Sequence, residues 1–121
     1  MRVLFDQATP VPIRPHLEGH AVRTAAQQGW DTLKNGDLLA AAEAAGFDLV
    51  LTTDKNMRYQ QNLAGRKIAV AVLSLQQWPQ LRPHVQLIVE AVNAATPGSY
   101  IEIDIPPEQA GDRERDRESE R

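Results

Sequence analysis

Unbroken apolar runs alternate along this chain with segments whose apolar residues recur at helical spacing. Three such runs lead into Asp6, Asp54 and Ser74 without the alternation of apolar and polar residues that marks a half-exposed strand. A strand that is buried on both faces of a parallel sheet has this unbroken pattern. The sequence therefore predicts buried strands over residues 2–6, 49–53 and 68–73.

The segments between these strands carry helix signals. Asp37 is well placed to cap a helix over residues 38–45, and Gly46 ends that helix. Further helices are predicted over residues 11–17, 57–63 and 78–95, the last with prolines in its first turns. A short strand is predicted over residues 20–24, and residues 99–105 alternate as in an edge strand. Strands that alternate with helices predict a three-layer α/β/α sandwich around a mostly parallel sheet.

Composition narrows the class of protein. The chain has 121 residues, 42% of them hydrophobic and 24% charged, which suits one globular domain. Its net charge of -3 gives no overall basic field that would indicate a nucleic-acid partner, and the absence of cysteine excludes disulfides and thiolate metal sites. No apolar run is long enough to cross a bilayer, and Met1 leads directly into a predicted strand, so we expect a cytoplasmic protein with no membrane partner.

The last fifteen residues differ from the rest of the chain. Residues 107–121 hold 6 acidic and 4 basic residues and no large apolar one, whereas residues 1–106 hold 10 acidic and 9 basic residues. A segment of this kind cannot bury enough apolar surface to offset its ordering entropy. We therefore expect one folded domain over residues 1–106 and a charged, disordered tail over 107–121.

Three carboxylates stand out by their positions. Asp6 ends the first strand, Asp54 ends a central strand, and Asp37 opens a helix between them. Ligands of open α/β sheets bind at the carboxyl ends of the strands, and carboxylates from separate elements can hold Mg²⁺ or Mn²⁺ there. Such an ion can activate water and stabilise charge on a phosphodiester. Spacing alone leaves the alternative that Asp37 only caps its helix.

Four blocks of the sequence resemble a known family. They are LFDQATP at residues 4–10, GHAV at 19–22, NGDLL at 35–39 and LTTDKN at 51–56. In order and spacing they are similar to the small PIN-like proteins of the Mut7-C-like (DUF5615) group. The resemblance covers about residues 1–75 and implies that residues 1–106 form a PIN-like domain. It also implies a metal-dependent ribonuclease, often the toxin of a toxin–antitoxin pair, with Asp6, Asp37 and Asp54 as the catalytic residues that hold Mg²⁺ or Mn²⁺.

Two positions depart from the pattern of that family. Gln7 stands where the first block more typically has glutamate, and Asn56 stands where the last block commonly has aspartate. An amide oxygen still ligates Mg²⁺, but it supplies no charge and cannot act as a base. The sequence is therefore compatible with a slow nuclease and with a PIN-like domain that binds RNA or a protein without cleaving it.

Residues near the three carboxylates are candidates for substrate binding. Thr9, Thr52 and Thr53 can hydrogen-bond a carboxylate or a metal-bound water, with packing at a turn or strand end as the alternative. Lys55 and Arg58 can contact RNA phosphates, as can Lys34, although a lone surface cation is usually only solvated. An antitoxin protein and a second copy of the chain are further candidate partners.

One alternative is a phospho-receiver domain, which also places an Asp at the end of its first and third strands. Asp6, Asp54 and Ser74 fit that arrangement in part, but Gln7 takes the place of a second acid. No lysine follows the last predicted strand, because the last lysine in the chain is Lys67. This alternative rests on analogy between folds, which is a weak argument for function.

Overall fold

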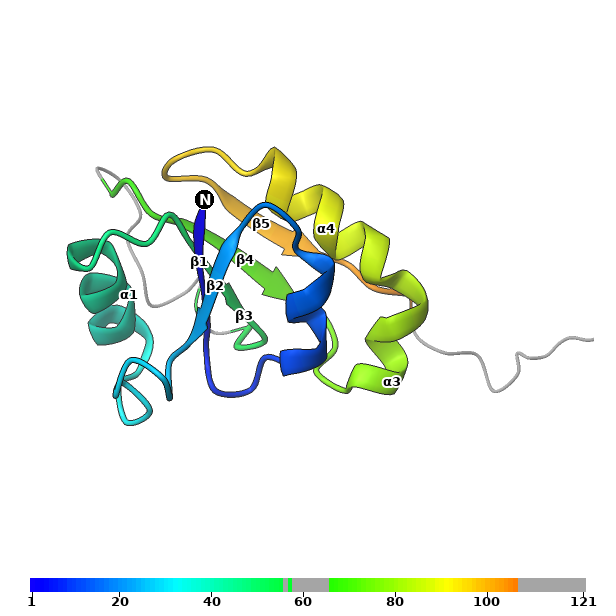
Figure 1. The fold of residues 1–121 in the computed structure, drawn as a ribbon, viewed down its shortest axis with the longest axis horizontal. Coiled ribbons are helices and arrows are strands. Elements are labelled where there is room, and N and C mark those ends of the chain that lie inside the picture. Colours follow the sequence, from blue (N-terminus) through cyan, green and yellow to red (C-terminus); the bar gives the residue numbers. More distant parts are fainter. Residues whose placement is uncertain (56, 58–65, 107–121) are drawn as a thin grey trace, which may run out of the picture.

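A sheet of five parallel strands forms the centre of the molecule in a computed structural model that describes residues 1–55, 57 and 66–106 (Figure 1). The strands are β1 (Arg2–Phe5), β2 (Ala21–Thr24), β3 (Leu49–Thr52), β4 (Ala69–Leu73) and β5 (Tyr100–Ile103). The helical segments are η1 (Val11–His16), α1 (Asn35–Ala44), α3 (Trp78–Leu81), η2 (Arg82–His84) and α4 (Val85–Ala94). All five strands lie where the sequence predicts strands.

The order of the strands places the ends of β1 and β3 side by side. The order of the strands in the sheet is β2-β1-β3-β4-β5. β2 therefore pairs with one side of β1, and β3 pairs with its other side after the chain crosses over. The register pairs Phe5 with Leu51, which brings the residues that follow each strand to the same edge. Sheets of this order bind ligands at the point between β1 and β3 where the strand order reverses.

Helices cover both faces of the sheet, so the domain has three layers. Successive residues of a strand point to opposite faces. Val3 and Phe5 accordingly pack in one apolar cluster with η1, α3 and α4, while Leu4 packs in a second cluster with α1 (Figure 1). Both clusters are built from buried side chains, which explains the unbroken apolar runs of β1, β3 and β4. The predicted three-layer α/β sandwich is confirmed.

The long helix predicted over residues 78–95 is wrong in its middle. The chain forms the short helix α3, a 3₁₀ turn η2, and then the longer helix α4. Pro83 explains the interruption, because proline lacks an N–H and its ring clashes with the preceding turn. The segment over residues 11–16 is likewise a 3₁₀ helix, with Pro15 inside it. The helix predicted over 57–63 and the tail 107–121 lie outside the described residues, apart from Met57.

Asp37 does not cap α1 as predicted. The helix begins at Asn35, and the carbonyl of Lys34 accepts hydrogen bonds from the N–H groups of Asp37 (2.9 Å) and Leu38 (3.1 Å). Asp37 therefore already lies in the first helical turn, where a carboxylate interacts favourably with the helix dipole. Lys34 takes the N-cap position instead, without a side-chain capping hydrogen bond.

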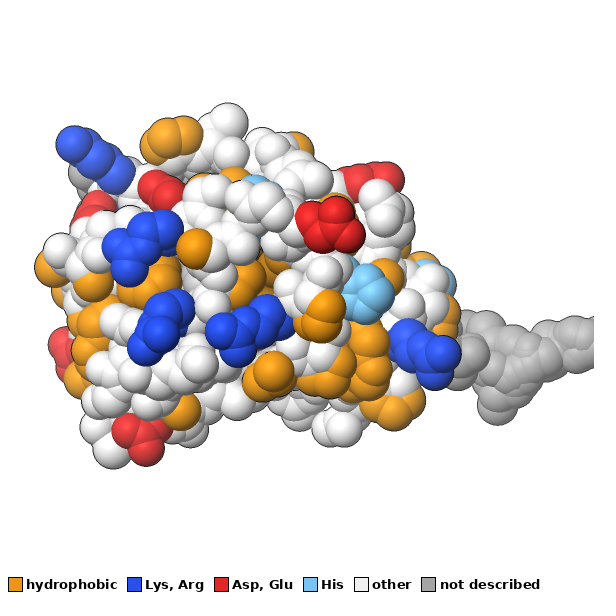
Figure 2. Space-filling model, viewed as in Figure 1, with side chains coloured by type: hydrophobic (Ala, Val, Ile, Leu, Met, Phe, Trp, Pro, Cys, Tyr) orange, Lys and Arg blue, Asp and Glu red, His pale blue; other side chains and the backbone are white. Residues whose placement is uncertain are grey.

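The outer edge of β2 is occupied by nearby side chains and backbone. The Val22 carbonyl accepts a hydrogen bond from Arg14 (3.1 Å). The Thr24 N–H donates to the side chain of Gln27 (2.9 Å), and the Thr24 carbonyl accepts from the Gln28 N–H (3.2 Å). Figure 2 shows Lys and Arg side chains spread over the face on which β2 lies. Such contacts protect an edge strand against pairing with another chain.

Among the described residues, no helix has both the length and the apolar character that crossing a bilayer requires.

Candidate functional site

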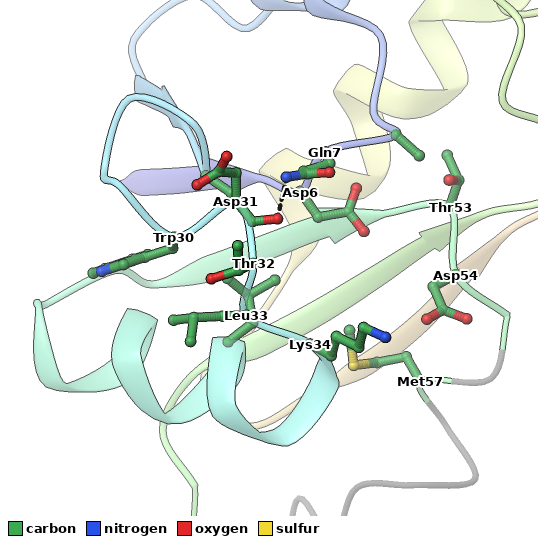
Figure 3. Close-up of a pocket in the computed structure, with 13 residues that line it drawn as sticks. Asp6, Gln7, Trp30, Asp31, Thr32, Leu33, Lys34, Thr53, Asp54 and Met57 are labelled. Atoms are coloured by element: carbon green, nitrogen blue, oxygen red, sulfur yellow. Dashed lines mark hydrogen bonds between the residues drawn. The ribbon is translucent and has the colours of Figure 1, made fainter.

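A pocket of about 620 Å³ opens at the carboxyl ends of β1 and β3. Asp6 and Ala8 contribute to it from the segment after β1, and Thr53, Asp54 and Met57 from the segment after β3. The loop between β2 and α1 closes the opposite wall with residues 30–34. Figure 3 shows the carboxylates of Asp6 and Asp54 turned toward the same hollow. The two acids that the sequence singled out at strand ends thus lie in one pocket.

Two buried hydroxyl groups hold the carboxylate of Asp6. Thr9 Oγ1 lies 2.6 Å from Asp6 Oδ1, and Thr52 Oγ1 donates a hydrogen bond to Asp6 Oδ2. Thr52 is fully buried and Thr9 is 4% exposed, so neither hydroxyl can exchange this partner freely for bulk water. Asp6 itself is half-buried. Its side chain is therefore fixed in direction, as a ligand or catalytic group must be.

The hydroxyl of Thr52 also links Asp6 to Asp54. While Thr52 donates to Asp6, it accepts a hydrogen bond from the backbone N–H of Asp54 at 3.0 Å. The backbone at Asp54 is thereby tied to the carboxylate of Asp6 through one side chain. This contact sets where the chain turns after β3 and hence where Asp54 enters the pocket.

The hydroxyl of Thr9 faces two acceptors with a single hydrogen. It lies 2.6 Å from Asp6 Oδ1 and 2.9 Å from the carbonyl oxygen of Leu51. A hydroxyl donates only one hydrogen bond, so an ionised Asp6 leaves one of these oxygen pairs without a hydrogen between them. A protonated Asp6 can instead donate to Thr9, and Thr9 can then donate to Leu51. With the neutral carboxyl, both of these oxygen pairs thus have a hydrogen between them.

Burial raises the pKa of the Asp6 carboxyl above its usual value, and the negative charge of Asp54 raises this pKa further. Hydrogen bonds from Thr52, Thr9 and the N–H of Ala8 act in the opposite direction without cancelling the rise. Perturbed acids of this kind concentrate at functional sites. A cation in the pocket would relieve the repulsion between the two carboxylates and favour the ionised form of both.

The loop after β2 brings a positive charge to the pocket. The side-chain amide of Gln7 donates to the carbonyl of Asp31, which joins this loop to the segment after β1. Trp30 packs edge-on against Phe47 with ring centroids 6.0 Å apart. These two contacts fix the loop. Figure 3 shows the amine of Lys34 turned into the hollow and the carboxylate of Asp31 turned away from it.

The structure brings together part of the predicted site. Asp6, Asp54 and Thr53 line the pocket, and Thr9 contacts Asp6. Asp37 is exposed in the first turn of α1 and does not line it.

Lys55 and Arg58 are the other two residues that were predicted to contact substrate. Lys55 lines two hollows beside the pocket at the same edge of the sheet, and Ser74 lines both hollows as well. Arg58, predicted to contact substrate, lies outside the described residues, as does Asn56.

Asp31 lines the pocket but was not among the candidate residues, whereas Lys34 was a candidate phosphate contact and Thr52 a candidate partner of a carboxylate. The position of residues 30–34, in a loop that leads from a strand to a helix, was a usable signal, because such loops form the binding edge of α/β sheets. No sequence signal identifies Thr52 as the link between the two acids, since that contact spans 46 residues.

The donor set suits a partly hydrated divalent ion. Within the part of the chain that the structure describes, no group of three or more His, Cys, Asp or Glu side chains is arranged to hold a metal ion. Mg²⁺ does not need such a cage, because it usually keeps several waters and binds through one or two carboxylates together with substrate phosphates. Asp6 and Asp54 supply that pair of carboxylates.

The chain matches no protein-family model, no curated protein and no solved structure.

Proposed function

We propose that this protein is a ribonuclease of PIN-like type that depends on Mg²⁺ or Mn²⁺. The observation that carries the proposal is the convergence of Asp6 and Asp54, from the ends of adjacent strands, in one pocket at the reversal point of the sheet. The similarity of four sequence blocks to PIN-like proteins supports the same activity. The raised pKa of Asp6 adds support, because a site of clustered acids is stabilised by a bound cation.

In the proposed hydrolysis of a phosphodiester, the residues of the pocket have different roles. A bound divalent ion supplies charge stabilisation at the phosphate and activation of water. Asp6 and Asp54 would hold that ion, with Thr9 and Thr52 fixing the direction of Asp6. Thr53 lies in the pocket and Lys55 in a hollow beside it, which supports a role for both in contacting the RNA strand.

The test is a titration with Mn²⁺ watched by calorimetry, together with cleavage of a single-stranded RNA in Mn²⁺ and in EDTA. We expect saturable binding of Mn²⁺ and cleavage that EDTA stops. Asp54→Asn should abolish both, because it removes half of the charge that holds the ion. Asp104→Asn is the matched control, since Asp104 is an exposed acid at the same sheet edge, in a different hollow.

Two results would refute the proposal. One is Mn²⁺ binding that is equally strong in wild type and Asp54→Asn, and the other is cleavage that survives that substitution.

A second candidate is a PIN-like module that binds RNA or protein without cleavage. The observation in its favour is that Lys34, a cation, lines the pocket, whereas the predicted third acid Asp37 does not. This candidate predicts RNA binding with no metal-stimulated cleavage and no rise in melting temperature on addition of Mn²⁺. The same titration and cleavage assay therefore distinguish the two.

A further inference from the structure

Lys34 combines three structural features that no other lysine among the described residues shares. It is the N-cap residue of α1, it lines the pocket that holds Asp6 and Asp54, and its amine is turned into that pocket (Figure 3). Its side chain makes no capping hydrogen bond, and its backbone carbonyl alone starts the helix. The position of the amine is thus not required by the helix itself.

A positive charge beside two acids has a definite effect on ligands. It disfavours a metal cation in the pocket and favours a group that carries negative charge, such as a phosphate. A metal ion held by two carboxylates leaves coordination positions for phosphate oxygens, and an amine beside it can bind the same phosphate as a point charge. Lys34 is placed to supply that contact from the wall opposite the acids.

We propose that Lys34 binds the RNA phosphate that lies next to the Asp6–Asp54 pair and so positions the strand in the pocket. The inference rests on the proposed function for the identity of the ligand. It adds a positioning residue that comes from the loop between β2 and α1, opposite the strand ends that carry the acids. The path of the strand then continues past Thr53 toward Lys55, because Thr53 lines both this pocket and the hollow that contains Lys55.

The test measures the binding of a fluorescent single-stranded RNA across a range of salt concentrations, in EDTA and in Mn²⁺, with gels to show that the RNA stays intact. Lys34→Met should weaken binding roughly 3- to 10-fold and reduce the slope of log affinity against log salt by about 0.7, the value for one lost contact to a single strand. Lys34→Arg should restore the affinity. Lys67→Met is the matched control, because Lys67 is exposed and lines a pocket with Met1 and Pro97 away from the carboxyl edge.

A second measurement separates phosphate binding from a structural role. Removal of the Lys34 charge should tighten Mn²⁺ binding by roughly 3-fold, because one repulsive charge leaves the pocket. RNA and Mn²⁺ affinities that change in opposite directions support the inference, whereas a loss of both shows that Lys34 only maintains the pocket and overturns it.

The remaining outcomes are also decisive. Wild-type RNA affinity and salt slope in Lys34→Met overturn the inference, as does an equal loss in Lys67→Met. A wild-type chain that binds no RNA overturns it even if Mn²⁺ binds. If RNA binding depends on Lys34 but Mn²⁺ does not bind the wild type, the inference stands and the nuclease proposal fails.

Discussion

Replacement of Asp6 by asparagine should stabilise the metal-free protein at neutral pH. In its ionised form the carboxylate lies beside the charge of Asp54, and Thr9 has one hydrogen for two acceptors. In Asp6→Asn the amide can donate to Thr9, Thr9 can donate to Leu51, and the asparagine oxygen can still accept from Thr52. The substitution therefore removes a charge and adds one satisfied hydrogen bond.

The size of this effect follows from the contacts. One additional buried hydrogen bond contributes about 1 kcal/mol, and relief of the buried charge acts in the same direction, so we expect a gain of about 1 to 2 kcal/mol. For a domain of this size the melting temperature should rise by about 4 °C per kcal/mol. Differential scanning calorimetry in EDTA measures the change. Asp31→Asn is the control, because Asp31 lines the same pocket but is exposed and turned away from it.

The pH dependence gives the reasoning a second check. Because the pKa of Asp6 is raised in the folded state, the folded protein binds more protons than the unfolded chain between the usual pKa and the raised one. The contribution of Asp6 to stability therefore falls as pH rises through this range. The advantage of Asp6→Asn should grow as pH rises through this range and should shrink toward zero below the usual pKa of 3.8. A variant that melts below wild type in EDTA at neutral pH, or an advantage that persists unchanged in acid, would refute the argument.

Two further predictions concern stability. Thr52→Val should destabilise the domain by about 2 kcal/mol, because it removes the hydroxyl that bonds one oxygen of Asp6 and the partly buried N–H of Asp54, whereas Thr52→Ser should cost about 1 kcal/mol. Urea unfolding measures both, and equal costs would show that the hydroxyl is unimportant. Gly29 and Gly98 both have φ of +76°, but a Cβ at Gly98 would lie 2.8 Å from the carbonyl oxygen of Arg66, while a Cβ at Gly29 would meet nothing within 4 Å. Alanine should therefore cost about 1 kcal/mol at Gly29 and about 3 kcal/mol or more at Gly98, and similar melting temperatures for the two variants would contradict this.

The sheet could be predicted from the sequence because each buried strand is marked by a run of apolar residues that are adjacent in the chain. Val3, Leu4 and Phe5 are all fully buried, so after Arg2 the first strand carries no polar position that would interrupt its apolar run. The same local signal placed Asp6 and Asp54 after their strands. Parallel pairing then brings the ends of neighbouring strands together, which is why two members of the site followed from the sequence.

The remaining parts of the site depend on contacts between distant segments. The start of α1 lies before Asp37, so the carboxylate takes a first-turn position outside the pocket and Lys34 enters it instead. The bond from Gln7 to the carbonyl of Asp31 sets the position of the loop, and it joins residues 24 apart. No spacing rule connects such a pair. The interruption of the long helix at Pro83, in contrast, was foreseeable from proline chemistry.

The hydrogen bonds that Arg14, Gln27 and Gln28 make to the backbone of β2 limit how copies of this protein could assemble through their sheets. Growth of a fibril by strand addition requires each subunit to pair with the next one through the edges of its sheet. The Val22 carbonyl and both backbone groups of Thr24 are already hydrogen-bonded within the chain, so a second copy that paired along β2 would have to displace these bonds. Self-association through the β2 edge is therefore disfavoured.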